Sequence, residues 1–333
     1  IEKEKEVEKI TTTIKRIFSW IVNHLLFIFI PAYRLEELSE REEKYERTVS
    51  RRKFIRRFKS FLTILGIILV FLIVTLAVFP HWISPYTYAE ALGVYPNSFQ
   101  PPSPDHLLGT TKFGRDVLTR LIFGARTSLT VALPAIGFSV IVGIIVGIIA
   151  GFYGGWVDSI IMRIVDVLLA FPGIILSLVF ISVFSDLFQT EIKIEYIMLA
   201  WGILGIPFYA RLIRGSVLQA KELPYIQAAK VAGANNWRIM FKHILPNVIQ
   251  PIIISVTFDI GGVILSLAGI SFLGFNDPTL MDWGNEINFT RERLYDAPWA
   301  SLFPGLFILI AVLGFMLLGD GLRDALDPRL KNL

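Results

Sequence analysis

The sequence predicts an all-α polytopic membrane protein with six transmembrane helices. Hydrophobic residues make up 54% of the 333 residues, and the mean hydropathy is +0.60. These residues come in long runs, and residues 61–79 form one that contains no charge. A hydrocarbon core about 30 Å thick needs about 20 apolar residues per helix, so this run is long enough to span a bilayer.

Residues 1–60 are predicted to form a separate cytoplasmic segment ahead of that run. Acidic and basic residues alternate over its start, a pattern typical of a solvated helix or of disorder. Residues 17–30 are apolar, but this stretch is only fourteen residues long and contains Asn23 and His24. We therefore favour an amphipathic helix in the membrane interface over a span, and the segment does not have the layout of a cleavable signal peptide.

Residues 61–128 are expected to contain the first transmembrane helix and an extracytoplasmic segment, and residues 129–333 a core with five more helices. The apolar runs assigned to these five helices are residues 129–150, 160–184, 194–213, 246–273 and 302–319. Because proline removes a backbone donor, kinks are predicted at Pro134, Pro172 and Pro207.

The charges predict that both termini are cytoplasmic. A basic stretch at residues 51–59 precedes the first span, and positively charged flanks stay on the cytoplasmic side. Six crossings then put the loop at residues 214–245 and the C-terminal tail on the same side. The rule disfavours an outer location for the basic residues between the first two spans, which are Lys112, Arg115, Arg120 and Arg126.

Glycines in the second apolar run are candidate helix-packing positions. Gly143, Gly147 and Gly151 repeat every four residues, which lines one helix face with small residues. This face allows close packing, either within the chain or between subunits. The alternative is that glycine is simply common in membrane helices.

Ionisable residues inside the runs are candidate functional positions because they are costly at membrane depth. Asp259 lies about halfway along the fifth run. It either lines the transport pathway or is satisfied by hydroxyl groups of neighbouring helices. Arg163 and Asp166 are three residues apart, a helical spacing that predicts a structural ion pair near the headgroups.

The loop at 214–245 is predicted to fold as a short helix, a sharp corner and a second helix. Pro224 suits a first helical turn, and Gly233 suits the left-handed position that ends a helix. The pair Asn235-Asn236 can cap the second helix, and Pro246 then marks the start of the fifth span. A helix of about two turns is marginal alone in water, so it must pack on a partner or on the chain's own helix ends.

The spacing in this loop resembles the EAA loop of ABC-importer permeases. It reads Gln227-Ala-Ala, three residues, Gly233, nine residues and then His243-Ile-Leu-Pro. In that family the loop forms a coupling helix that docks into a cleft of the ATP-hydrolysing subunit. Gln227 replaces the family's usual glutamate, so coupling is expected to rest on the Ala-Ala surface and the glycine corner. The resemblance implies coupling roles for Glu222, Tyr225, Gln227, Ala228, Ala229, Gly233, Leu245 and Pro246.

The resemblance is closest to the C-type permease of the oligopeptide, dipeptide and nickel importers. Further matching stretches lie at residues 106–126, 151–158, 271–274, 297–299 and 319–329. It implies the type I ABC-importer permease (MetI-like) arrangement, with a cytoplasmic coupling helix. Where that family often has a glutamate, this chain has Leu267, so a relocated acid is a further hypothesis for Asp259.

The same resemblance implies partners and a cargo. The partners are a B-type permease that completes a heterodimer, two ABC ATPase subunits, an extracytoplasmic substrate-binding protein and the lipid of the cytoplasmic membrane. The expected cargo is a di- or oligopeptide, and an oligosaccharide or nickel stays open. In the last outer segment we expect the aromatic side chains to lie at the membrane interface rather than against the binding protein, namely Trp283, Tyr295 and Trp299.

The sequence argues against catalysis by this chain. It has no Gly-x-x-x-x-Gly-Lys-Ser/Thr loop, so ATP and Mg²⁺ are expected to be used by the partner ATPases, with no cofactor bound here. With no cysteine and four scattered histidines, no metal site is expected. Basic residues cluster beside the spans, which disfavours nucleic acid as a partner. A secondary transporter or channel that moves protons or cations on Asp259 is the rival hypothesis.

Overall fold

The computed structural model describes Lys15, residues 60–277 and residues 279–326. Within these ranges the regular structure is helical, apart from one isolated bridge between Thr110 and Asp116. The interfacial helix expected at residues 17–30 lies outside the described residues.

Most of the predicted spans are single helices. Those long and apolar enough to cross a membrane are α3 (Phe61–Val78), α6 (Val117–Tyr153), α9 (Ile194–Ala220), α13 (Gln250–Phe272) and α15 (Trp299–Leu326).

The third span is broken rather than straight. Helices α7 (Gly155–Leu169) and α8 (Gly173–Phe188) qualify only together and meet at 93°. The prediction of six spans therefore holds when this bent pair is one span. The break falls at the predicted Pro172, whereas Pro134 and Pro207 lie inside α6 and α9 without ending either helix.

The glycine face of α6 packs within the chain, against α9. A Cβ added at Gly143 would lie 2.5 Å from the Cβ of Tyr209, and one added at Gly147 would collide with the Ala210 carbonyl oxygen. Such approach is possible only without side chains, which is the reason for the four-residue glycine repeat. Helices α3, α13 and α15 complete the bundle, with α15 packed against both α3 and α13.

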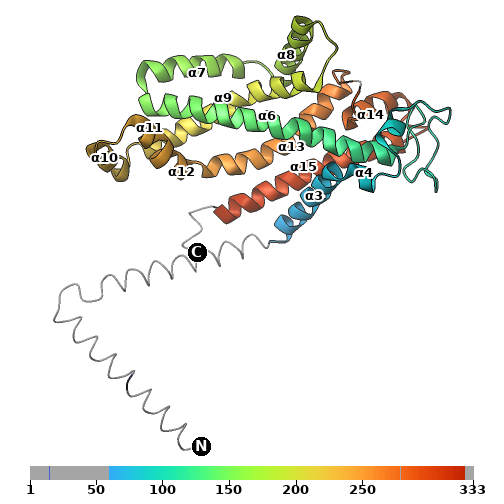
Figure 1. The fold of residues 1–333 in the computed structure, drawn as a ribbon, viewed down its shortest axis with the longest axis horizontal. Coiled ribbons are helices and arrows are strands. Elements are labelled where there is room, and N and C mark those ends of the chain that lie inside the picture. The colour runs from blue at the N-terminus through green and yellow to red at the C-terminus, as the bar shows by residue number, and fades with distance from the viewer. Residues whose placement is uncertain (1–14, 16–59, 278, 327–333) are drawn as a thin grey trace, which may run out of the picture. The chain divides into compact units, whose positions relative to one another are not determined.

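Short elements gather at the two ends of this bundle (Figure 1). One end carries α10 (Pro224–Val231), α11 (Asn236–Arg238), a π-helical turn at Ile239–Ile244 and α12 (Leu245–Val248). The opposite end carries α4 (Pro80–Ile83), α5 (Tyr88–Leu92), α14 (Trp283–Thr290) and a 3₁₀ turn at Arg291–Arg293. The two ends match the predicted cytoplasmic loop and extracytoplasmic segments in position along the chain.

Candidate functional site

Helix α10 is the predicted short helix of the 214–245 loop, and it stands out from the bundle. Pro224 lies in its first turn, and Ile226 is its one buried side chain. Ile226 belongs to the main apolar core, so it anchors the helix to the chain. No sequence pattern marks Ile226 as this anchor, because it lies between Tyr225 and Gln227 without a distinguishing spacing.

Gly233 ends this helix as predicted. Its φ is +77°, the left-handed conformation that glycine adopts without strain. The amide of Ala234 donates to the Ala229 carbonyl at 3.1 Å, and the amide of Gly233 donates to the Lys230 carbonyl at 3.0 Å. These two bonds satisfy carbonyls at the end of α10 and turn the chain sharply.

The predicted coupling residues are distributed over both faces of the loop. Ala229 and Leu245 are half-buried, and Leu245 packs against the core. The others face outward: Glu222, Tyr225, Gln227, Ala228, Gly233 and Pro246. Most of the implied docking surface is therefore free to meet a partner.

Two exposed apolar side chains extend this surface beyond the residues that the resemblance implied. Val231 is 90% exposed. The Trp237 ring stacks on Phe241 with 5.1 Å between ring centroids, and the Trp237 side chain is still 60% exposed. Large apolar groups exposed together at a helix tip are typical of an interaction site.

The second helix of the loop differs from the prediction. The Asn235 side chain caps α11 by accepting from the Arg238 amide at 2.8 Å, as expected. The chain then passes through a π-helical turn and α12, and Pro246 lies in the first turn of α12. The fifth span begins only at Gln250. Single π turns inside helical segments occur often at functional sites, but nothing in a sequence pattern marks them.

The predicted ion pair between Arg163 and Asp166 is wrong. Asp166 instead accepts from Arg211 of α9 at 2.5 Å, because α7 packs along α9 and meets its basic residues. One turn further along α9, Arg214 binds both oxygens of Asp158 at 2.5 and 2.6 Å. These two pairs join α7 to α9, and the Arg214 pair is the less exposed of the two.

A cavity of about 290 Å³ lies within the membrane-spanning bundle. Asp259 of α13 faces it and accepts a hydrogen bond of 2.5 Å from the Tyr209 hydroxyl of α9. From the sequence, a Ser or Thr hydroxyl was the expected partner of this carboxylate, and the structure has the Tyr209 hydroxyl instead. Ser139, Trp201, Gly262 and Ser266 also line the cavity.

The break between α7 and α8 forms one wall of the cavity. Leu168, Leu169, Phe171 and Gly173 line this wall, on both sides of Pro172. Irregular backbone at membrane depth is tolerated where it is buried in protein or borders a cavity.

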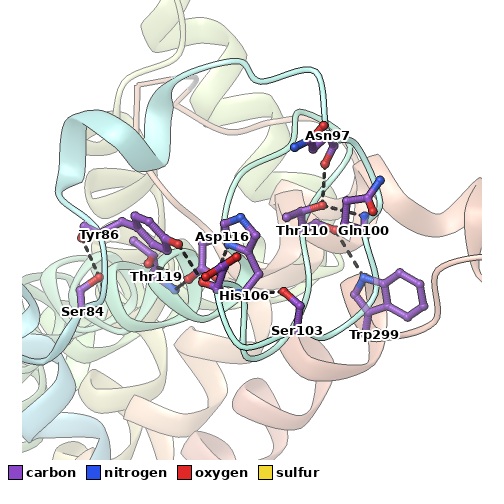
Figure 2. A network of polar contacts seen from close by, with 11 residues as sticks. Ser84, Tyr86, Asn97, Gln100, Ser103, His106, Thr110, Asp116, Thr119 and Trp299 are labelled. Carbon is purple, nitrogen blue, oxygen red and sulfur yellow. Dashed lines mark hydrogen bonds and ion pairs between the residues drawn. The ribbon is translucent and has the colours of Figure 1, made fainter.

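Polar contacts hold together the end of the bundle opposite α10 (Figure 2). The Asp116 carboxylate caps α6 by accepting from the Thr119 amide at 2.8 Å, and it also contacts the His106 ring at 3.1 Å. The hydroxyl of the buried Thr110 donates to the Asn97 carbonyl, and the Trp299 indole donates to the carbonyl of Thr110. These contacts tie the segment between α5 and α6 to the start of α6 and to the start of α15.

The basic residues that the charge rule disfavours at this end have local contacts. Arg120 pairs with the buried Glu286, and Arg115 donates to the carbonyls of Leu92 and Gly93. The Lys112 ammonium lies 5.9 Å from the Phe113 and Phe289 ring centroids, and Arg126 lies 3.5 Å from His81. Arg115 and Arg120 are thus held within the fold, whereas the side chains of Lys112 and Arg126 remain exposed.

The three aromatic residues that were expected at the membrane interface do not share one environment. Trp283 is fully buried, and its indole donates to the Leu121 carbonyl at 2.9 Å, so its expected place at the membrane interface is wrong. Tyr295 is almost fully exposed, and Trp299 is half-buried. Among the described residues, no three His, Cys, Asp or Glu side chains are close enough to hold a metal ion.

Comparisons with known proteins fit this architecture. Residues 143–332 match the family model described as the binding-protein-dependent transport system inner membrane component. The dipeptide transport system permease protein DppC of Alkalihalophilus pseudofirmus is 40% identical over 283 residues, which are 85% of this chain and 90% of that protein. The glutathione transport system permease protein GsiD of Pectobacterium atrosepticum is 39% identical over 283 residues, 84% of this chain and 92% of that protein.

A solved structure shares the fold. A chain of the MetNI methionine ABC transporter, in an inward-facing conformation, superposes with a TM-score of 0.52 and covers 62% of this chain and 97% of its own length. The sequence identity is 19%, so this likeness concerns the fold alone.

Proposed function

Since this chain belongs to the family of binding-protein-dependent transport system inner membrane components, we propose that it forms half of the translocation pathway of an ATP-driven importer of short peptides. The chain is a multi-pass permease subunit and not an enzyme. In the proposed complex a related B-type permease supplies the other half of the pathway. Two ATPase subunits on the cytoplasmic side and an extracytoplasmic binding protein complete it.

The exposed helix α10 is the observation that carries this proposal. A two-turn helix with a single buried anchor gains little stability from its own chain, so it is suited to packing on a partner. In the proposed mechanism α10 docks on an ATPase subunit, and the Gly233 corner transmits its movement to α11 and α12. Both termini and this loop then lie in the cytoplasm, while α14 and the Figure 2 network face the binding protein.

Peptide is the proposed cargo because of the relatives. One is named as a dipeptide permease and another as a glutathione permease, and both cover most of this chain. An oligosaccharide or nickel would use the same architecture. The cavity offers a single acid, which suits a peptide amino group better than it suits a transition metal with several ligands.

Uptake by the reconstituted complex tests the proposal. The whole assembly is placed in liposomes, with the binding protein and a labelled dipeptide on one face and ATP on the other. Ionophores collapse the proton and sodium gradients. We expect accumulation that requires ATP and the ATPase subunits. Accumulation that follows an ion gradient without ATP would identify a secondary transporter instead.

A further inference from the structure

We propose that the cavity at Asp259 is a binding site for a primary ammonium group of the cargo, with the Asp259 carboxylate as its counter-ion. The inference rests on the proposed function, because it assigns this cavity to the path of a transported peptide. It goes beyond that function by naming the chemical group that the permease itself recognises.

The first argument is the lack of a positive partner for the acid. The Tyr209 hydroxyl is a neutral donor at 2.5 Å, and in the part of the chain that the structure describes no Lys, Arg or His pairs with Asp259. An acid inside a membrane bundle is costly unless it is paired or faces a water-filled cavity. Asp259 is half-buried at the wall of a cavity, so a cation that enters can reach it.

The second argument is the aromatic lining. Phe171, Trp201 and Phe208 border the same cavity as the carboxylate. Aromatic faces attract ammonium groups, most strongly where water is excluded. An acid together with aromatic rings therefore selects an organic cation over a strongly hydrated inorganic one.

The third argument is an unused donor. Within the described residues, the indole nitrogen of Trp201 is the one buried side-chain polar atom without a hydrogen-bond partner. Such a group carries a desolvation cost and calls for an explanation. Trp201 lines the same cavity as Asp259, so a peptide carbonyl that enters with the amino terminus is the candidate acceptor for this indole.

The broken third span supplies a fourth argument. The C-terminal end of α7 and the N-terminal end of α8 meet at the cavity, between Leu169 and Gly173. The carbonyls that end a helix favour positive charge, and the amides that begin one favour negative charge. Transporters use discontinuous helices in this way to bind small charged substrates. The two helix ends therefore bring backbone groups of both polarities to the wall of the cavity.

Thiol labelling tests the charge of the cavity. Because the chain contains no cysteine, Ser266→Cys introduces a single thiol at the cavity wall. Gly262→Cys gives a second, independent thiol, since a side chain there projects into open space. The assembled complex is treated with a cationic or an anionic methanethiosulfonate reagent, and the mass of this chain is followed with time. The rate for each reagent is divided by the rate of the same reagent with a free thiol in solution, which removes the difference in intrinsic reactivity.

We expect the cationic reagent to react at least about tenfold faster than the anionic one at either thiol, because a carboxylate in a low-dielectric site attracts it strongly. Asp259→Asn in the same background should bring the ratio close to one. Equal rates for the two reagents with Asp259 intact would overturn the proposal, because Asp259 would then carry no unpaired negative charge in the cavity.

A second measurement asks whether peptide occupies the site. A dipeptide with a free amino terminus should slow labelling of Ser266→Cys several-fold, while its N-acetylated form should not, and Asp259→Asn should remove the difference. Equal protection by both peptides would overturn the inference. The labelling experiments test the site at Asp259, and the ATP dependence of uptake tests the class of transporter. Failure of one proposal can therefore be distinguished from failure of the other.

Discussion

The guanidinium of Arg120 on α6 donates to the carboxylate of Glu286 on α14, and the two side chains are only 2% and 5% exposed. Arg120 also donates to the Ala91 carbonyl of α5 at 2.7 Å. One buried arginine therefore joins three elements at the end of the bundle opposite α10. Breaking a buried pair leaves an uncompensated charge, which costs far more than an exposed pair contributes.

Glu286→Gln is expected to destabilise this end of the bundle by about 3–5 kcal/mol, because Arg120 keeps its charge and loses its counter-ion. The measurement is thermal unfolding of the purified complex in detergent, followed by tryptophan fluorescence, to which the buried Trp283 contributes. Glu292→Gln is the matched control, since Glu292 is exposed and belongs to no ion pair of the described residues. Equal melting of the two variants would contradict the assigned role.

Asp282 is expected to make the stability of this region depend on pH. Burial, followed by the charge of Glu286, raises the pKa of its carboxyl to about 6, although the Asn285 amide and Ser271 favour the ionised form. The unfolded chain has a pKa near 3.9 at this residue, so the folded state binds the extra proton between these values. Its contribution is therefore present below pH 4 and is lost as the pH rises through 6, on the order of 3 kcal/mol in all.

Asp282→Asn isolates this effect, because asparagine can still cap α14 but does not titrate. We expect the difference in melting temperature between the two proteins to change steadily from pH 4 to pH 7, in favour of the asparagine variant at the higher pH. If the two melting temperatures differ by the same amount at every pH in this range, the pKa of Asp282 is not raised by folding.

Local features of the sequence predicted much of this fold. The apolar runs predicted the spans, because a helix that crosses the bilayer needs about 20 consecutive apolar residues. Pro224 and Gly233 predicted both ends of α10, since each acts through its own backbone restriction. The four-residue glycine repeat predicted a packing face but not its partner, α9.

Contacts between distant residues could not be predicted in this way. Arg120 and Glu286 are 166 residues apart, and Tyr209 and Asp259 are 50 apart, so no spacing in one helix links them. The error at Asp166 has the same origin, because helical spacing offered Arg163 while the neighbouring helix supplied another arginine. Candidate polar residues were therefore found one at a time, and only the fold revealed the partner of Asp259 and the cavity that it faces.

Val231→Asp is expected to weaken binding of the ATPase subunits at least about tenfold, because it places an unpaired charge in the proposed docking surface. Val231 is 90% exposed and packs on little of its own chain, so insertion and folding should not change. Val94→Asp is the control, as Val94 is 73% exposed at the opposite end of the bundle. Co-purification and titration of the ATPase onto the permease pair in nanodiscs give the affinities. Equal affinities for both variants would remove α10 from the interface.

Gly233→Val is expected to abolish the stimulation of ATP hydrolysis by cargo-loaded binding protein while the permease still inserts and assembles. A β-branched residue is strained at φ +77°, and the corner that orients α10 against α11 would open. A Cβ added at Gly233 meets no neighbouring atom within 4 Å, so the predicted cause is backbone strain rather than a clash.

Gly233→Asn separates these two causes, because asparagine tolerates the left-handed region and brings a side chain of similar size. It should retain most of the stimulation. Equal loss in both variants would mean that bulk at this surface matters, and normal stimulation in Gly233→Val would show that coupling does not depend on the corner.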